Sequence, residues 1–489
     1  MDNLSSLSYF IPELTLTVTL LLVLCSDLLH REQEGLDFPA WLALVGMFVA
    51  FVAHFGLYGK PAVSLFEGMI AHDPFAVFFK GFFIFCTFII VLLSIYSSEV
   101  FYYRKSEYLA ILSAICLGMC LTASSTNLIM LYLSIELMSI GSYLLAGFAR
   151  SGGKTDEAAI KYVLFGAMST GVMLFGMSIL YGLTGTMDIA GIRQVLFANV
   201  SSDPVVLLSF LFVLVGAGYK IAAVPFHFWC PDVYEGAPTP VTAFLSVASK
   251  GTGFALLIRF FYRAMLQPAG EGTWSSLPAI DWMLLFAILS AVTMTAGNLG
   301  AMPQRNIKRL LAYSAIAHAG YLLMGIAALT SEGIASILFY LVMYLFTNLT
   351  AFLVVMILVN RTGEDEIPSY RGLWQRAPLP AVVMAIALIS LTGLPPTAGF
   401  VGKLYLFIAA WHSGLYWLVV VAVLNSVVSL YYYFRIVRAM FLETGPDTAI
   451  SHQPVYETVL VLLAAPILLL MIFFGPVLRL AQYCAQMLP

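Results

Sequence analysis

Apolar residues in this chain form long runs that are separated by short polar stretches. Fourteen of the runs are long enough to cross a bilayer, which takes about twenty residues. Their approximate extents are 8–29, 39–58, 74–96, 107–124, 126–149, 157–184, 204–226, 238–263, 278–302, 307–329, 333–359, 379–411, 415–441 and 454–485. The pattern predicts an all-α, polytopic membrane protein with about 14 transmembrane helices.

The composition agrees with this prediction and excludes several classes of protein. Of the 489 residues, 61% are hydrophobic and 10% are charged, whereas about a quarter of the residues are charged in soluble domains. The net charge of −3 does not indicate a nucleic-acid partner. The six cysteines form no CxxC pair, and neither a GxGxxG nor a P-loop string occurs. The sequence therefore predicts no metal, haem or nucleotide cofactor in this chain.

Basic residues are distributed unevenly between the loops on the two sides of the predicted membrane. Thirteen lie on one side: Arg31, Arg104, Lys105, Arg150, Lys154, Arg305, Lys308, Arg309, Arg361, Arg371, Arg376, Arg435 and Arg438. Five lie on the other side: Lys60, Arg193, Arg259, Arg263 and Arg479. Because positive loops stay inside, the richer side is predicted to be cytoplasmic and both termini to face outward. The expected location is the cell inner (cytoplasmic) membrane.

The five remaining basic residues are all lysines, and all of them lie within the apolar runs. They are Lys80, Lys161, Lys220, Lys250 and Lys403. A lysine at the bilayer centre costs roughly 2.5–3.5 kcal/mol on insertion scales. A buried lysine can release its proton, whereas an arginine stays charged. This distribution indicates a protein that handles protons within the membrane.

Two runs, 204–226 and 238–263, and the turn between them form the most unusual part of the chain. They contain VLVGAGYKIAAVPFHFWCPDVYEGAPTPVTAFLSVASK, with Lys220 in the first run and Lys250 near the middle of the second. Because proline lacks a backbone donor, a helix break is expected around Ala223–Pro225, next to Lys220. A broken helix beside a buried charge is typical of transporters.

The run 379–411 contains the same elements in another order. Its string SLTGLPPTAGFVGKLYLF predicts a break around Leu394–Pro396, followed by Lys403. Lys403 follows Lys220 by 183 residues. The same offset from Glu136 falls one residue from His318. We therefore expect two inverted five-helix repeats with broken helices. The expected division is 1–106 for N-terminal helices (the first three runs), 107–263 for the first repeat, 278–441 for the second and 454–489 for a C-terminal helix.

Glu136 is the carboxylate nearest the middle of any run. It lies about nine residues into the run 126–149, hence roughly 14 Å deep at 1.5 Å per residue. We predict that it is the partner of Lys220, because an opposite charge within ~4–6 Å keeps both groups ionised. A pair that a conformational change makes or breaks would act as a proton switch. The alternative is a protonated, hydrogen-bonded residue that only packs between helices.

Several other ionisable residues are candidates for the same path, each with a structural alternative. Lys250 and Lys403 lie deep in their runs, and their alternative is snorkelling to the interface. His318 and His227 can exchange a proton near neutral pH, but a single histidine in a helix often only packs. Lys161 lies four residues after a glutamate, so a surface ion pair is its alternative.

Two further ionisable residues lie near the ends of their runs. We expect Lys80 to reach the membrane surface by snorkelling. Glu13 is expected to face headgroups or a partner helix.

With these residues in hand, the chain resembles the antiporter-like membrane subunits of proton-pumping NADH:quinone oxidoreductase, respiratory complex I. Three such paralogues exist, and the N type is the one whose sequence motifs are most similar to those of this chain. The strings that carry this similarity are PFHFWCPDVYEGAPTPVTAFLSVASK, NIKRLLAYSAIAHAGY and GLPPTAGFVGKLYLF. Lys403 also fits the N type, since the M type typically has a glutamate there. The resemblance covers essentially the whole chain.

The resemblance implies a fourteen-helix fold and a proton path through Glu136, Lys220, Lys250 and Lys403. It implies a subunit of a translocase that moves protons outward from the cytoplasm, coupled at a distance to quinone reduction. The chain itself is expected to carry no cofactor and no redox chemistry, with FMN, iron–sulfur clusters and quinone in partner subunits. The expected partners are the paralogous antiporter-like subunits, small membrane subunits and the lipid bilayer.

Two other functions remain open from the sequence. The first is a cation (Na⁺)/proton antiporter subunit, for which several carboxylates would be expected because hard cations prefer oxygen ligands. Here one central carboxylate faces three lysines, which favours protons. The second is a structural membrane subunit that moves no ions. It is disfavoured because each charge within the membrane costs insertion energy.

Overall fold

The structure is a computed structural model that describes residues 3–29, 38–100, 105–149, 153–199, 204–270, 272–277, 281–445 and 454–486. Arg31, Arg104 and Arg150, which contribute to the predicted orientation, lie outside the described residues. The chain divides into two compact units. Unit 1 consists of Met1–Ile221, Ala248–Asp281 and Tyr483–Pro489, and unit 2 of Ala222–Val247 and Trp282–Gln482.

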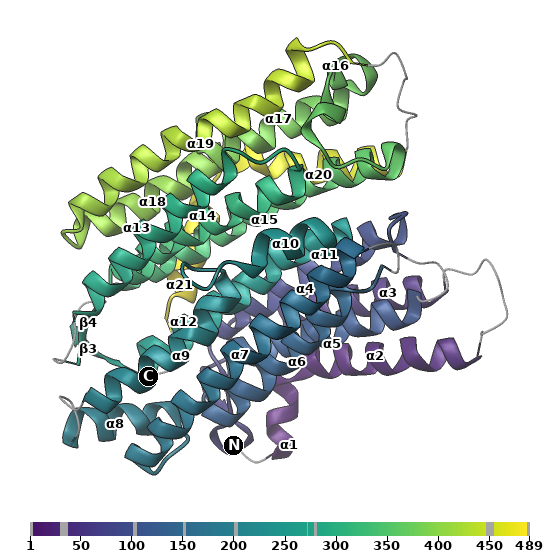
Figure 1. Cartoon of the computed structure of the whole chain (residues 1–489). Helices are drawn as coiled ribbons and strands as arrows, with labels where there is room; N and C mark the ends of the chain where they lie inside the picture. Colours follow the sequence, from purple (N-terminus) through teal and green to yellow (C-terminus); the bar gives the residue numbers. More distant parts are fainter. Residues whose placement is uncertain are drawn as a thin grey trace. The chain divides into compact units, whose positions relative to one another are not determined.

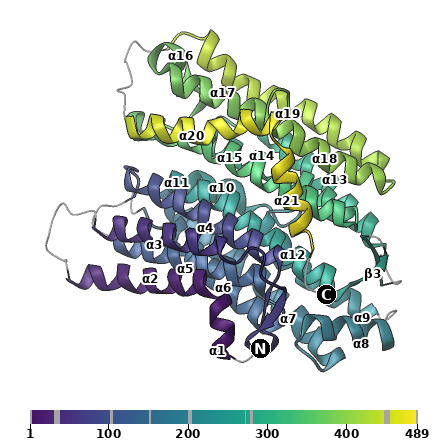
Figure 2. The same ribbon diagram turned by 180° about the vertical axis from the view of Figure 1, so that it is seen from behind.

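Unit 1 is helical apart from two short hairpins (Figure 1). Its helices are α1 (Asn3–Ser6), η1 (Leu7–Tyr9), α2 (Ile11–Leu29), α3 (Phe38–Phe55), η2 (Phe66–Gly68), α4 (Pro74–Ile95), α5 (Lys105–Ser124), α6 (Leu128–Ala146), α7 (Gly153–Thr184), α8 (Ile189–Asn199), α9 (Pro204–Ile221) and α12 (Lys250–Ala264). Antiparallel strands β1 (Val63–Leu65) and β2 (Ile70–His72) form one hairpin, and β3 (Leu266–Gly270) and β4 (Thr273–Ser276) form the other. Helix α5 packs against α2, α4 and α6, and α7 packs against α9 (Figure 2).

Unit 2 is built from helices only, as far as the described residues go. They are α10 (Trp229–Gly236), α11 (Thr239–Phe244), α13 (Trp282–Ala301), α14 (Ile307–Ala327), α15 (Ser331–Thr362), η5 (Ile367–Tyr370), α16 (Leu373–Arg376), α17 (Pro378–Thr392), α18 (Ala398–His412), α19 (Tyr416–Leu442), α20 (Pro454–Ile472) and α21 (Gly475–Cys484). A π-helical turn, Leu245–Ser249, joins α11 to α12. Helices α13 and α14 are in backbone contact, because a Cβ on Gly297 would lie 2.4 Å from the Ala317 nitrogen.

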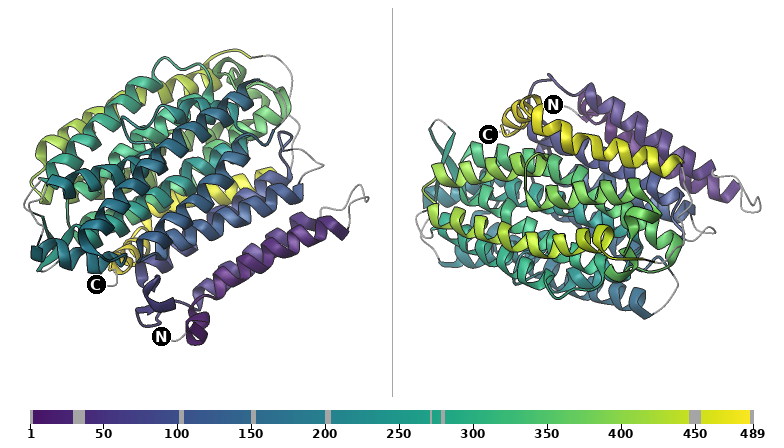
Figure 3. Two further views of the ribbon diagram at one scale, coloured as in Figure 1. Left: turned by 60° about the horizontal axis from the view of Figure 1, so that its bottom comes forward. Right: turned by 90° about the horizontal axis from the view of Figure 1, so that it is seen from above.

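Twelve helical segments of the described residues are long and apolar enough to cross a membrane, with α11, the π-helical turn and α12 counted as one of them. A thirteenth span is obtained when α1, η1 and α2, which bend by 83° (Figure 3), are counted together. Helices α17 and α18, of 15 residues each, lie on either side of a break within the predicted run 379–411. A helix pairs its own backbone N–H and C=O groups in hydrogen bonds, and lipid offers these groups no alternative partners. The predicted all-α polytopic fold is confirmed, and the number of about 14 spans depends on how broken helices are counted.

Both predicted helix breaks are present, and a proline explains each of them. Helix α9 ends at Ile221, whose carbonyl would accept from residue 225 in a continued helix, and that residue is Pro225. Helix α17 ends at Thr392, which stands in the same relation to Pro396. The next helices, α10 and α18, begin only after several non-helical residues.

The predicted C-terminal run 454–485 is two helices and not one. Helix α20 ends at Ile472, again four residues before a proline, Pro476. Helix α21 then starts at Gly475. The hydrophobic run alone hid this break because the apolar pattern continues across it.

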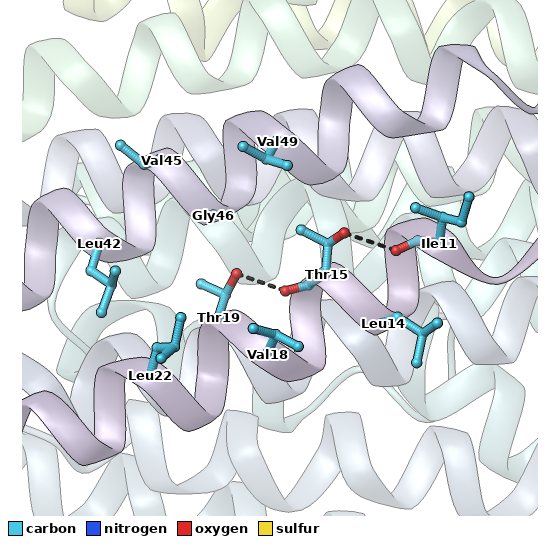
Figure 4. A pocket seen from close by; sticks show the side chains of 10 residues that line it. All are labelled: Ile11, Leu14, Thr15, Val18, Thr19, Leu22, Leu42, Val45, Gly46 and Val49. Carbon is cyan, nitrogen blue, oxygen red and sulfur yellow. Dashed lines mark hydrogen bonds between the residues drawn. The ribbon is translucent and has the colours of Figure 1, made fainter. Parts of the chain in front are cut away.

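A groove of about 350 Å³ lies between α2 and α3 (Figure 4). Its only hydroxyl groups, on Thr15 and Thr19, donate to carbonyls one turn back, at 2.9 and 2.7 Å. The lining residues are Ile11, Leu14, Thr15, Val18, Thr19, Leu22, Leu42, Val45, Gly46 and Val49. The groove therefore presents an apolar surface without a polar group directed at a ligand.

Candidate functional site

Lys220 lies in the last turn of α9 in unit 1 and is 1% exposed. Its Nζ lies 5.4, 5.6 and 5.5 Å from the ring centres of Tyr143, Tyr162 and Tyr219. The sulfur of Met138 lies 3.8 Å from the same nitrogen. No oxygen of the described residues accepts a hydrogen bond from Lys220. Aromatic rings and a thioether stabilise a cation weakly, so these contacts do not fix the charged form.

Glu136 lies on α6 in the same unit and is partly exposed. It is within electrostatic reach of Lys220, but the two side chains form no direct ion pair in the described structure. The Glu136 Oε1 is buried and accepts no hydrogen bond from the described residues. The predicted partners Glu136 and Lys220 are therefore near each other, but no ion pair is formed between them.

Lys250 is the first residue of α12 and is 2% exposed. It follows directly on the π-helical turn that ends at Ser249. The Ser249 hydroxyl donates to the Met138 sulfur over 4.0 Å, and the same sulfur receives Lys220. π-turns within helices are frequent at functional sites. Met138 thus connects the surroundings of Lys220 with the start of the Lys250 helix.

Lys403 lies on α18 in unit 2 and is 3% exposed. Its Nζ donates to the Thr392 carbonyl at 2.8 Å and to the Ser426 hydroxyl at 3.3 Å. It also lies 4.4 Å from the ring centre of Tyr321. The Thr392 carbonyl is the one that the proline break leaves without a backbone donor. Gly393, with φ of +87°, is required at the break, since a Cβ there would lie 2.7 Å from Lys403 Cδ.

His318 lies on α14 in unit 2 and is 2% exposed. Its Nδ1 lies 2.5 Å from the Tyr340 hydroxyl, and its Nε2 lies 3.4 Å from the Tyr433 hydroxyl. The ring centre is 5.8 Å from that of Tyr321. The Tyr321 hydroxyl lies 3.1 Å from that of Ser426, which binds Lys403. Unit 2 therefore brings the predicted residues His318 and Lys403 to one group of hydroxyl side chains.

A small cavity of about 10 Å³ lies beside His318. It is large enough for about one water molecule. The Thr347 and Ser390 hydroxyls on its wall are 3.0 Å apart, and Ser390 accepts from the Gly399 nitrogen at 3.1 Å. The break between α17 and α18 thus has a polar lining inside the protein, as irregular backbone at membrane depth requires.

The two remaining predicted residues have more exposed positions. His227 is half-buried in the segment between α9 and α10, with its ring centre 4.4 Å from that of Phe228. Lys161 forms an ion pair of 2.6 Å with Glu157, and the two side chains are 36% and 59% exposed. The surface ion pair that was the structural alternative for Lys161 is therefore present.

The expected position of Lys80 at the membrane surface is wrong. Its Nζ lies 2.7 Å from Glu13 Oε1, and both side chains are 0% exposed. Helix α4 is covered by α3 and α5, so a side chain in its second turn meets protein and not headgroups. Of the two surroundings expected for Glu13, the partner helix is the one observed.

The tyrosines around both lysines were not predicted from the sequence. Signals for two of them were present in the chain. Tyr219 directly precedes Lys220 in the sequence. Tyr321 follows His318 by three positions, which places His318 and Tyr321 on one face of α14. The other tyrosines come from separate helices, so only the packing brings them to the site.

No metal site is apparent in the part of the chain that the structure describes. Nowhere in it do three or more His, Cys, Asp or Glu side chains gather closely enough to hold a metal ion.

Comparisons with known proteins cover nearly the whole chain. Residues 125–429 match the family described as NADH:quinone oxidoreductase/Mrp antiporter, TM. NADH-quinone oxidoreductase subunit N of Anaeromyxobacter sp. (strain Fw109-5) is 43% identical, covering 99% of this chain and 98% of that protein. NAD(P)H-quinone oxidoreductase subunit 2 of Synechococcus sp. (strain JA-3-3Ab) is 42% identical, covering 90% of this chain and 82% of that protein.

Solved structures share the fold. A chain of respiratory complex I from Thermus thermophilus with bound aureothin is 30% identical, with a TM-score of 0.80, covering 96% of this chain and 98% of that chain. A chain of the Mrp complex from Dietzia sp. DQ12-45-1b is 21% identical, with a TM-score of 0.83, covering 98% of this chain and 97% of that chain. At this identity the similarity concerns the fold alone. The resemblance drawn from the sequence motifs is confirmed. The chain belongs to the NADH:quinone oxidoreductase/Mrp antiporter family, and within it to the N subunits of NADH-quinone oxidoreductases.

Proposed function

We propose that this chain is a proton-translocating subunit in the membrane arm of an NADH:quinone oxidoreductase. It moves protons from the cytoplasm outward and is coupled at a distance to quinone reduction. One observation carries the proposal: Lys220 and Lys403 are both buried next to a helix end that a proline imposes. A buried ammonium beside irregular backbone is how transporters build an ion site at membrane depth.

In unit 1, Glu136 and Lys220 form the switch. When Glu136 approaches, its charge holds the proton on Lys220, and when it withdraws, the buried ammonium releases that proton towards Lys250. The open arrangement, in which three rings and a sulfur of the described residues surround the Lys220 Nζ, supports the releasing state. A change of three pKa units in any group is worth about 4 kcal/mol, which exceeds the ~2.3 kcal/mol per charge at 100 mV.

In unit 2, His318 and Lys403 form the outgoing relay. Three hydroxyls support this role: that of Tyr340 lies beside His318, that of Ser426 beside Lys403, and that of Tyr321 beside that of Ser426. Hydroxyl groups can accept one proton while they donate another, so a chain of them passes charge without a large motion. Lys161 and His227 are proposed as peripheral members of the path.

The partners follow from the same proposal. NADH oxidation, FMN, the iron–sulfur clusters and the quinone belong to other subunits of the complex, and this chain contacts the paralogous antiporter-like subunits and small membrane subunits. The complex lies in the cell inner membrane, with both termini of this chain outside. Tags at the termini should be reachable only from outside, and a tag in the Arg361–Arg376 loop only from inside. A terminus reached from the cytoplasm would contradict the proposed direction.

Lys250→Arg in the purified, reconstituted complex tests the proposal. Arginine keeps the positive charge but does not release its proton at neutral pH. We expect normal assembly, with fewer protons taken up into liposomes per NADH oxidised, because the step through residue 250 is blocked while the paralogous subunits are unchanged. Lys250→Ala should behave similarly. Parental stoichiometry in Lys250→Arg would show that this lysine is no relay, and sodium-dependent transport by the parental complex would favour the antiporter alternative.

A further inference from the structure

Glu13 and Lys80 form a buried ion pair that the proposed path does not use. Glu13 lies on α2 and Lys80 on α4, with 2.7 Å between Oε1 and Nζ and both side chains 0% exposed. Neither Glu13 oxygen, nor the Lys80 nitrogen, makes a hydrogen bond of normal geometry to the described residues. Desolvating such ions costs several kcal/mol each, and only additional hydrogen bonds offset this. A contribution to stability therefore does not account for the pair.

A second buried ion pair in unit 1 shows what a pair with a purely structural role looks like. Arg259 donates to both Asp73 oxygens, at 2.5 and 2.9 Å, and twice to the Ala123 carbonyl, at 3.0 and 2.7 Å. Asp73 also accepts from the Ala76 nitrogen at 2.8 Å and so caps α4. Here hydrogen bonds satisfy both the Arg259 guanidinium and the Asp73 carboxylate, and they connect α4, α5 and α12. The Glu13–Lys80 pair lacks all of these additional bonds.

A buried histidine lies next to the Glu13–Lys80 pair. The His54 ring on α3 rests on the backbone of α4 at Gly81, where a Cβ would lie 2.5 Å from its Cε1. Its Nε2 lies 2.6 Å from the Val77 carbonyl and therefore carries the proton. Its Nδ1 is then a free base, buried and without a hydrogen bond to the described residues. The pair is thus accompanied by a buried, neutral imidazole.

Two further titratable groups face this cluster. Cys120 on α5 interacts electrostatically with both Glu13 and Lys80. His72, which ends β2 just before α4, is 1% exposed. Burial, together with the positive charge of Lys80, lowers the pKa of His72 to about 4. His72 is therefore neutral at pH 7 and adds no charge to the cluster, and its buried Nδ1 makes no hydrogen bond to the described residues.

We propose that Glu13 and Lys80, with His54 beside them, are a second proton-holding site of the subunit, located in its N-terminal helices. Transfer of the proton from Lys80 Nζ to Glu13 Oε1 breaks an N–H bond and forms an O–H bond. It leaves a neutral amine and a neutral acid, so no net charge is created in apolar surroundings. The acid can then release this proton while the amine takes up another. The inference rests on the proposed proton translocation.

Helix α4 links this site to the main path. Phe82 and Phe83, which follow Lys80 closely, pack on Gly251, the residue after Lys250. A change in the protonation of the pair can therefore reach the start of α12 through a rigid helix. The pair is accordingly expected to influence translocation and not only assembly.

The test replaces the pair by apolar residues of similar size, Glu13→Leu with Lys80→Met, in the complete complex. Such a replacement removes the buried charges but keeps the packing, and it is often neutral or stabilising for a merely structural pair. Three quantities are measured: the amount of assembled complex, NADH:quinone activity, and proton uptake into liposomes per NADH oxidised. Glu443→Gln is the control, because it removes one carboxylate of an exposed pair with Arg371, at 2.8 Å.

We expect the double variant to assemble like the parent but to translocate several-fold fewer protons per NADH, with the control unchanged. Single variants Glu13→Gln and Lys80→Met should show the same loss, and if either fails to assemble the double variant still decides. Parental stoichiometry in the assembled double variant would overturn the inference while leaving the main path intact. A parental complex that translocates no protons would instead overturn the proposed function.

Discussion

The two buried lysines beside helix breaks have opposite kinds of surroundings. Lys220 is touched by three tyrosine rings and a sulfur, and a carboxylate, Glu136, stands nearby without contact. Lys403 is held by two oxygen acceptors, and no carboxylate of the described residues pairs with it. Hydrogen bonds from a charged donor are worth about 1.5–3 kcal/mol and a desolvated cation–π contact about 2 kcal/mol, so the two sites differ in the kind of contact more than in its strength. In the proposed mechanism, Lys220 is therefore controlled by the charge of Glu136, and Lys403 by fixed dipoles.

The order of break and lysine explains this difference. In α9 the lysine precedes the break, and because helical side chains tilt towards the N-terminus of their helix, Lys220 is directed away from the carbonyls that the break leaves free. In α17 and α18 the lysine follows the break, and its side chain reaches back to the carbonyl of Thr392. The same two ingredients, a lysine and a proline, therefore give two different sites.

The largest expected effect comes from removing the movable charge. Glu136→Gln should lower proton translocation about tenfold or more, because Lys220 loses the charge that holds its proton. The measurement is proton uptake per NADH in liposomes, with assembled complex quantified in parallel. Glu332→Gln, in an exposed pair with His412, is the control. Unchanged translocation in Glu136→Gln would remove the switch from the mechanism.

A smaller effect is expected when the second site is made to resemble the first. Ser426→Asp places a carboxylate where a hydroxyl now lies 3.3 Å from Lys403 Nζ. It should stabilise the ammonium by up to about 1.4 kcal/mol relative to the present hydroxyl, which slows proton release about tenfold at most. Ser426→Asn has nearly the same size without the charge, so it should retain most of the rate. Equal rates for the two variants would mean that the charge state of Lys403 does not limit transport.

The smallest effect concerns the rings around Lys220. Tyr143→Phe keeps the ring that lies 5.4 Å from Nζ and should translocate protons at close to the parental rate. Tyr143→Leu removes the ring and about 0.5–2 kcal/mol of cation–π stabilisation, so a change of a few-fold is expected. Initial rates of proton uptake in the two variants would be compared. A full loss in Tyr143→Phe would show that the hydroxyl, and not the ring, matters.

Much of this architecture could be read from single stretches of sequence. The spans follow from runs of about twenty apolar residues, and the breaks follow from Pro225 and Pro396, because a proline cannot donate to the carbonyl four residues earlier. Lysines inside such runs indicate a proton path because burying them is costly. These predictions depend only on local backbone chemistry and on transfer free energies, which each segment carries by itself.

The tertiary structure alone decided which side chains meet. Glu13 and Lys80 each lie near the end of an apolar run, where snorkelling is the usual outcome, yet packing of α4 beneath α3 and α5 buries them as a pair. Likewise, Tyr143 and Tyr162 reach Lys220 from two other helices. Hydrophobic periodicity determines that a helix spans the membrane but leaves its rotation and its neighbours open, since lipid and apolar protein surface are nearly equivalent surroundings. Only the close packing of small and large side chains between helices selects one arrangement, and with it the chemistry of each buried charge.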